Sequence, residues 1–124
     1  AATKHAIEGY SESLDHELRT MGIRVSVIEP AFMKTAIDAN SRDADAKLDA
    51  YRDVRVAMDT RLKEMLDVAE DPDVVADTVL KAARAASPKT RYTSGTAAAR
   101  LRLMHTLLPA SLLDAGIRKQ LRIA

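Results

Sequence analysis

The chain of 124 residues contains no cysteine and no tryptophan, and only one phenylalanine and three tyrosines. Without cysteine it cannot form disulfides, cysteine nucleophiles or cysteine-ligated metal sites. So few aromatic side chains argue against a stacking platform for single-stranded nucleic acid. No apolar run approaches the roughly 18 residues that a membrane-spanning helix needs. The first residues offer neither a basic segment nor an apolar core of the kind that opens a secretion signal, so we expect a cytoplasmic protein.

Glycine and histidine are also scarce, and their placement excludes further classes of site. The four glycines stand at positions 9, 22, 95 and 116, which cannot build a Gly-rich phosphate loop. The three histidines, at positions 5, 16 and 105, lack the spacing of metal ligands. No serine has the sequence context of a nucleophile elbow. We therefore expect no metal site, and composition alone indicates little catalysis.

Charge is balanced in total but unevenly distributed. The net charge is +1, yet residues 1–80 carry 10 basic and 17 acidic side chains, whereas residues 81–124 carry 9 basic and 1 acidic. One interpretation is a basic, amphipathic tail that contacts an anionic membrane or nucleic acid, through Arg100, Arg102, His105, Arg118, Lys119 and Arg122. The other, which we favour, is that the two halves attract each other within one fold or across a dimer. The proportions of 47% apolar and 30% charged residues are typical of a folded domain.

The first 30 residues predict a helix, a tight turn and a buried strand. Apolar residues recur at helical spacing over residues 1–20 and predict the buried face: Ala2, Ala6, Ile7, Tyr10, Leu14 and Leu18. Gly9 interrupts this helix and suggests that something packs closely there. Gly22 is suited to end it in the left-handed conformation. The β-branched segment 23–29 then predicts a strand bounded by Pro30, and a helix followed directly by a strand implies a parallel sheet.

The rest of the chain predicts four more helices and one more strand. We expect helices near 46–67, 72–86, 97–107 and 109–121, and a short strand near 91–94. The helix at 72–86 is predicted to bury Val75, Ala76, Val79, Leu80 and Ala83. The fold class is therefore α/β, with two short parallel strands that form part of a doubly wound, Rossmann-like sheet.

Two segments carry a resemblance to a known family. Residues 1–14, with Lys4 followed by small and apolar residues, resemble the helix that bears the Tyr-x-x-x-Lys motif of short-chain dehydrogenases/reductases. Residues 22–35 resemble the sixth strand of that family and its Pro-Gly-x-x-x-Thr turn, with Ala31 in place of the glycine. The resemblance continues to the end of the chain but covers only the C-terminal half of the family's domain. It implies that residues 1–124 are part of an NAD(P)-binding Rossmann domain, with a substrate loop over 31–70, and that the tyrosine would stand just before Ala1.

The resemblance also implies a cofactor and a set of site residues. The cofactor would be NAD or NADP. Lys4 would be catalytic, because a nearby ammonium stabilises the phenolate of a tyrosine one helical turn away, and it would also bind the nicotinamide ribose. Pro30, Ala31, Met33 and Thr35 would contact the cofactor at the carboxyl end of the strand, where open α/β sheets bind ligands.

The function implied is hydride transfer between the cofactor and an alcohol or ketone. A stripe of adaptable apolar residues suits a bulky apolar substrate, although such a stripe is more often core packing: Phe32, Met33, Ile37, Tyr51, Met58 and Met65. By itself the chain is expected to be inactive, and to need its own N-terminal half or a second copy, as a homo-oligomer, to be ordered. We expect no nucleic-acid partner. The alternative is a non-enzymatic interaction module that uses the basic tail.

Overall fold

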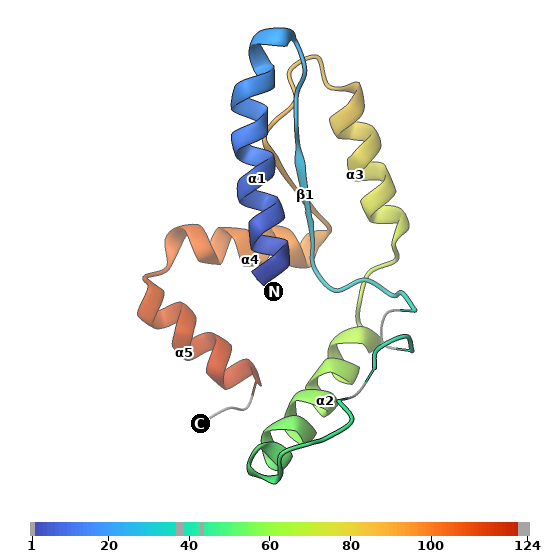
Figure 1. The fold of residues 1–124 in the computed structure, drawn as a ribbon, viewed down its shortest axis with the longest axis vertical. Coiled ribbons are helices and arrows are strands. Elements are labelled where there is room, and N and C mark those ends of the chain that lie inside the picture. Colours follow the sequence, from blue (N-terminus) through green and yellow to red (C-terminus); the bar gives the residue numbers. More distant parts are fainter. Residues whose placement is uncertain (1, 37–38, 43, 122–124) are drawn as a thin grey trace. The chain divides into compact units, whose positions relative to one another are not determined.

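In the computed structural model, which describes residues 2–36, 39–42 and 44–121, five α-helices accompany a two-stranded sheet (Figure 1). The elements run in the order α1 (Ala2–Leu18), β1 (Val27–Pro30), α2 (Arg52–Asp67), α3 (Asp73–Arg84), β2 (Arg91–Ser94), α4 (Thr96–Leu107) and α5 (Ala110–Leu121). Short 3-10 turns follow α1 at Arg19–Met21 and precede α2 at Asp49–Tyr51. The predicted α/β class is confirmed.

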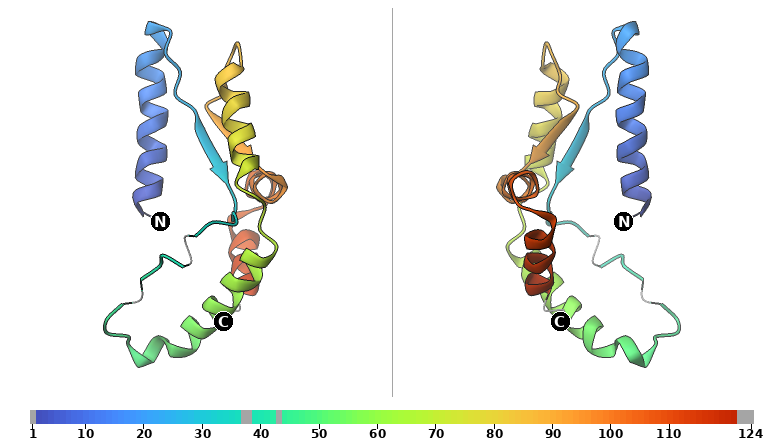
Figure 2. Two further views of the ribbon diagram at one scale, coloured as in Figure 1. Left: turned by 90° about the vertical axis from the view of Figure 1, so that its right-hand side faces the viewer. Right: turned by 90° about the vertical axis from the view of Figure 1, so that its left-hand side faces the viewer.

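The two strands are parallel, with Val27 opposite Arg91 and Pro30 opposite Ser94. The chain forms two compact units, of which the first comprises Ala1–Ala31 and Asp73–Ala99 and contains α1, both strands and α3. Within this unit α1 lies beside one face of the strands and α3 beside the other, as Figure 2 shows. Helices on both faces of a parallel sheet are the layering of a doubly wound fold. The fold prediction therefore holds for this unit.

Alternation along β2 explains the two layers of the first unit. Successive strand residues point to opposite faces. Arg91 bonds to carboxylates of α1, whereas the buried Tyr92 and Ser94 belong to the core on the α3 side. The Ser94 hydroxyl donates to the Val74 carbonyl oxygen of α3 at 3.0 Å. The hydrogen bonds of a single strand therefore attach both helices to the sheet.

The strand predicted over 23–29 is shorter than expected and lies at 27–30. The Val25 amide donates to the Asp15 carboxylate at 2.9 Å and not to a neighbouring strand. Sheet pairing begins where the Val27 amide donates to the Thr90 carbonyl oxygen at 2.8 Å. The helix predicted from residue 46 also begins later, at Arg52, after the 3-10 turn. Gly22 has φ of 75° and ends the helical segment in the left-handed conformation, as predicted.

The prediction for the apolar face of α1 was only partly right. Leu14 and Leu18 are partly buried, but Ile7 and Tyr10 are 55% and 67% exposed, whereas Asp15 is completely buried and Glu8 and Glu12 are partly buried. The acidic side of the helix faces the strands because two arginines, Arg24 in the segment before β1 and Arg91 of β2, bind its carboxylates. The inference about Gly9 was also wrong, since a Cβ there would meet no described atom within 4 Å.

The prediction for α3 was only partly right. Ala82 is buried and Val75 is partly buried, but Ala76, Val79, Leu80 and Ala83 are exposed. The side of α3 that faces the sheet carries Val74, Thr78 and Ala82, because these residues lie four apart on one stripe of the helix. The predicted stripe with Ala76, Val79, Leu80 and Ala83 is covered by none of the described residues.

The second unit comprises Phe32–Pro72 and Arg100–Ala124. In it α2 packs against α5. The segment after β1 is held by a parallel bridge between Met33 and Glu70, in which the Lys34 amide donates to the Glu70 carbonyl oxygen at 3.0 Å. No helix in the described part of the chain combines the length and the apolar character needed to cross a membrane.

Candidate functional site

Lys4 lies in the first turn of α1, at the carboxyl edge of the sheet. Helix α1 packs beside β1 and runs in the opposite direction, so its first turn and Pro30 lie at the same end of the first unit (Figures 1 and 2). Because the strands are parallel, their carboxyl ends share this edge, and open α/β sheets bind ligands there. The Lys4 side chain is exposed and has no ion-pair or hydrogen-bond partner among the described residues. Its ammonium is available to a ligand.

The five predicted site residues divide between the two units. Lys4, Pro30 and Ala31 come together at one end of the first unit, where Pro30 closes β1. Met33 and Thr35 belong to the second unit. The Met33 backbone is part of the bridge to Glu70, and the exposed Thr35 hydroxyl has no partner among the residues that the structure describes. The assignment of all five to a cofactor stays a prediction.

A buried carboxylate anchors the far end of α1. Asp15 accepts two hydrogen bonds from the Arg24 guanidinium, at 2.9 and 3.3 Å, one from the Val25 amide and one from Arg19. The hydrogen bonds from Arg24, followed by those from Arg19 and Val25, hold the pKa of Asp15 well below its usual range. The hydrogen bond with Asp15 in turn raises the pKa of Arg24. Asp15 is therefore a permanently charged anchor at neutral pH.

A second ionic cluster joins α1 to both strands nearer to Lys4. The Arg91 Nε atom lies 2.6 Å from Glu12 Oε1, and its Nη1 atom lies 3.1 Å from Glu8 Oε2 and also contacts Glu29. The sequence analysis predicted neither ionic cluster. The available signal was the spacing of Glu8, Glu12 and Asp15, which places three carboxylates on one helix stripe.

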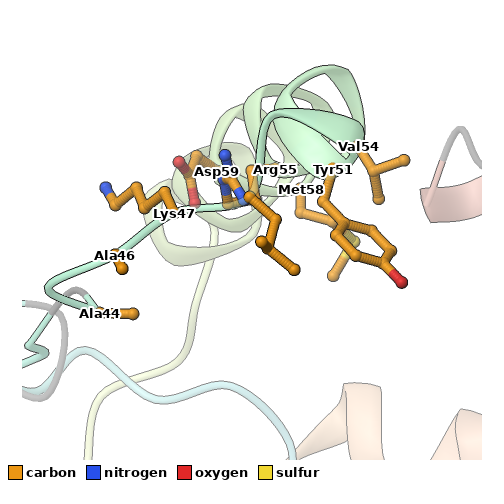
Figure 3. Close-up of a pocket in the computed structure, with 9 residues that line it drawn as sticks. Ala44, Ala46, Lys47, Tyr51, Val54, Arg55, Met58 and Asp59 are labelled. Atoms are coloured by element: carbon orange, nitrogen blue, oxygen red, sulfur yellow. The ribbon is translucent and has the colours of Figure 1, made fainter.

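The second unit carries a groove of about 450 Å³ along the start of α2. Figure 3 shows Tyr51, Val54 and Met58 on one side of it and Lys47, Arg55 and Asp59 on the other. Of the apolar stripe predicted to meet substrate, Tyr51 and Met58 line this groove, whereas Phe32, Met33 and Met65 do not. Ile37 lies outside the described residues, as does Arg122 of the predicted basic tail.

Comparison with known proteins identifies the family. A family model described as short chain dehydrogenase matches residues 1–46, the segment that holds α1, β1 and the turn after it. Human retinol dehydrogenase 16 is 30% identical over 91% of this chain and 40% of its own length. An uncharacterised oxidoreductase of Schizosaccharomyces pombe is 35% identical over 75% of this chain and 39% of its own. The mouse 17-beta-hydroxysteroid dehydrogenase type 6 is 27% identical over 92% of this chain and 40% of its own.

The parallel strands with helices on both faces place the chain in the doubly wound α/β class. Together with the matched segment and these relatives, this layering defines its family: the chain belongs to the short-chain dehydrogenases/reductases. It spans about two fifths of the length of the relatives just named.

Proposed function

We propose that this chain is part of an oxidoreductase that transfers hydride between NAD or NADP and an alcohol or ketone. The observation that carries the proposal is the Lys4 ammonium, which has no partner among the described residues and stands in the first turn of α1, at the same end of the first unit as the end of β1. Family membership supports the same reaction class. We use the term parent enzyme for the protein in which this chain follows the segment expected to supply the tyrosine before Ala1.

The donors at this edge fit the polar part of a nicotinamide nucleotide. A lysine ammonium offers three hydrogen-bond donors and no acceptor, which suits the hydroxyl oxygens of a ribose. The family resemblance implies that the Thr35 hydroxyl and the backbone around Ala31 and Met33 would contact the carboxamide or a phosphate. When it is bound, the cofactor provides the ring that donates or accepts hydride.

Lys4 has a second proposed role, in proton transfer. A tyrosine hydroxyl has a pKa of about 10, which is too high for efficient acid–base chemistry at neutral pH. An ammonium within about 4–6 Å favours the phenolate and lowers that pKa. Lys4 would act in this way on a tyrosine four residues earlier, one turn along the same helix.

The groove along α2 supports a bulky apolar substrate. Tyr51, Val54 and Met58 present apolar surface, while the charged residues Lys47, Arg55 and Asp59 line its other side (Figure 3). Two relatives are named for retinol and for a hydroxysteroid, both apolar alcohols. We propose the same chemical class for this chain. The alternative of a membrane or nucleic-acid module has less support, because the family model matches residues 1–46 and relatives named as dehydrogenases align with 91% and 92% of the chain.

Replacement of Lys4 by Met tests the proposal, because Met preserves length and removes the charge. In the parent enzyme we expect Lys4→Met to lower kcat/KM by about 10²–10⁴-fold, the usual contribution of acid–base catalysis, and to weaken cofactor binding. Lys63→Met removes an exposed lysine of α2 and serves as the control. Near-normal hydride transfer in Lys4→Met would remove Lys4 from the site. We also propose that the 124 residues alone are inactive, because they contain neither a Gly-rich loop nor a tyrosine four residues before Lys4.

A further inference from the structure

Lys4, Glu8 and Glu12 form one stripe along α1, each one helical turn from the next. Arg91 of β2 binds the two glutamates of this stripe and also Glu29, the residue before Pro30 at the end of β1. A single guanidinium therefore joins the helix that carries Lys4 to the strand end that carries the predicted cofactor turn. Its planar guanidinium presents five N–H donors in a fixed fork, which suits three carboxylates at once, whereas a lysine ammonium has three donors on a single nitrogen.

We propose that Arg91 is a positioning residue for Lys4, because it sets the tilt and rotation of α1 against the carboxyl end of β1. This inference rests on the proposed function of Lys4. Arg91 touches neither cofactor nor substrate in the proposed reaction, and it acts through the two glutamates that follow Lys4 on the helix.

Electrostatics make Arg91 hard to replace at this place. Three carboxylates surround it, and the hydrogen bond with Arg91 lowers the pKa of Glu12, while the glutamates raise that of Arg91. Removal of the guanidinium leaves three like charges facing one another across α1 and β1. Like charges this close repel, so the near end of α1 would move away from the strand.

The second anchor of α1 explains why this movement would reach Lys4. Asp15, bound to Arg24 and the Val25 amide, would still hold the far end of the helix. Lys4 precedes Asp15 by eleven residues, or about 16 Å along the helix axis. A tilt of only about 4° around Asp15 would displace Lys4 by about 1 Å, and a misplacement of about 1 Å at a reacting centre can cost about 100-fold in rate.

The test compares Arg91→Met and Arg91→Lys with Arg118→Met in the parent enzyme. Arg118 is also ion-paired, to Asp114 of α5, but it lies in the other unit. We expect Arg91→Met to lower kcat by about 100-fold, to weaken cofactor binding, and to shift the pH midpoint of the rate upward by about one unit, because the ammonium no longer favours the phenolate. Arg91→Lys should fall between Arg91→Met and the wild type, and Arg118→Met should match the wild type.

A compensating variant separates positioning from stability. Glu12→Gln combined with Arg91→Met removes one of the repelling charges, so it should regain much of the lost thermal stability. If Arg91 positions Lys4, relief of this repulsion should also return kcat and the pH midpoint part of the way to the wild-type values, when both variants are assayed below their unfolding transitions. Wild-type kcat and pH midpoint in folded Arg91→Met, or recovery of stability with no change in either quantity, would overturn the proposal and leave Arg91 a structural residue only.

The two proposals fail in different ways. If Lys4→Met leaves hydride transfer intact, the proposed function is wrong whatever Arg91 does. If Lys4→Met inactivates the enzyme but Arg91→Met keeps the wild-type cofactor affinity and pH profile, Arg91 has no positioning role and the proposed function stands.

Discussion

Ser94 offers a sharp test of how α3 is held to the sheet. Its side chain is fully buried, and its hydroxyl donates to the Val74 carbonyl oxygen at 3.0 Å and accepts from the Thr78 hydroxyl at 3.1 Å. Thr78 also lies 2.9 Å from the Val74 carbonyl oxygen. In Ser94→Ala the Thr78 hydroxyl can turn to that carbonyl, so no buried polar group is left without a partner. The loss is therefore about one net hydrogen bond, or about 1 kcal/mol.

Hydrogen exchange measures this loss where it occurs. About 1 kcal/mol corresponds to roughly fivefold faster exchange of amides that exchange through local opening of α3 and β2. Mass spectrometry of peptides from these elements in the parent enzyme should show that increase in Ser94→Ala. Thr106→Ala, which removes an exposed hydroxyl bonded within α4, should leave these peptides unchanged.

The pair with Thr78 makes the reasoning refutable. Thr78→Val should cost about as much as Ser94→Ala, because each single variant keeps one hydroxyl that donates to the Val74 carbonyl oxygen. The double variant keeps neither hydroxyl, so its cost should be close to the sum of the two single costs. Unchanged exchange in Ser94→Ala, or a double variant that costs no more than Ser94→Ala alone, would refute this account of the contact.

Two further predictions concern acid and assembly. Hydrogen bonds in the folded state hold the pKa of Asp15 below its ordinary value of 3.8, so its stabilising effect is complete above that pH and is lost as the pH falls below it. Denaturant midpoints should therefore fall below about pH 4, and Asp15→Asn, but not Asp114→Asn, should remove this component. Because Ile7 and Tyr10 are 55% and 67% exposed, the isolated chain should associate or bind hydrophobic dye. Size-exclusion chromatography with light scattering measures this, and a compact, cooperatively unfolding monomer of 13.5 kDa would contradict the prediction.

The order of elements could be predicted from the sequence because it depends on local chemistry. The left-handed turn at Gly22 and the strand at 91–94 were predicted at the correct residues, and most helix ends were correct within one or two. The β-branched segment before Pro30 also predicted a parallel strand, which pairs with β2. Its first residues were predicted wrongly, because Asp15, distant in the sequence, takes the amide of Val25.

The candidate site was predictable only in part. The position of Lys4 and Pro30 at one end of the first unit follows from a helix and a strand that run in opposite directions. The Met33 bridge to Glu70 was not predictable, because it joins backbone atoms whose side chains give no signal. The role of Arg91 was missed for another reason: its partners Glu29 and Glu8 lie 62 and 83 positions away, and no local pattern pairs charges that far apart in the sequence.

The sequence by itself determined which residues of α1 share a face, because helical periodicity places Ile7 with Tyr10 and Glu8 with Glu12. Only the tertiary structure decided which of these faces packs against the sheet. Arg24 and Arg91 lie opposite the helix, and a carboxylate that is bound by a guanidinium can be buried, whereas an arginine facing apolar side chains would lose its hydration without compensation. The acidic face of α1 therefore packs against the sheet. Which face packs there depends on the charge of the residues opposite the helix, and helical periodicity carries no information about that charge.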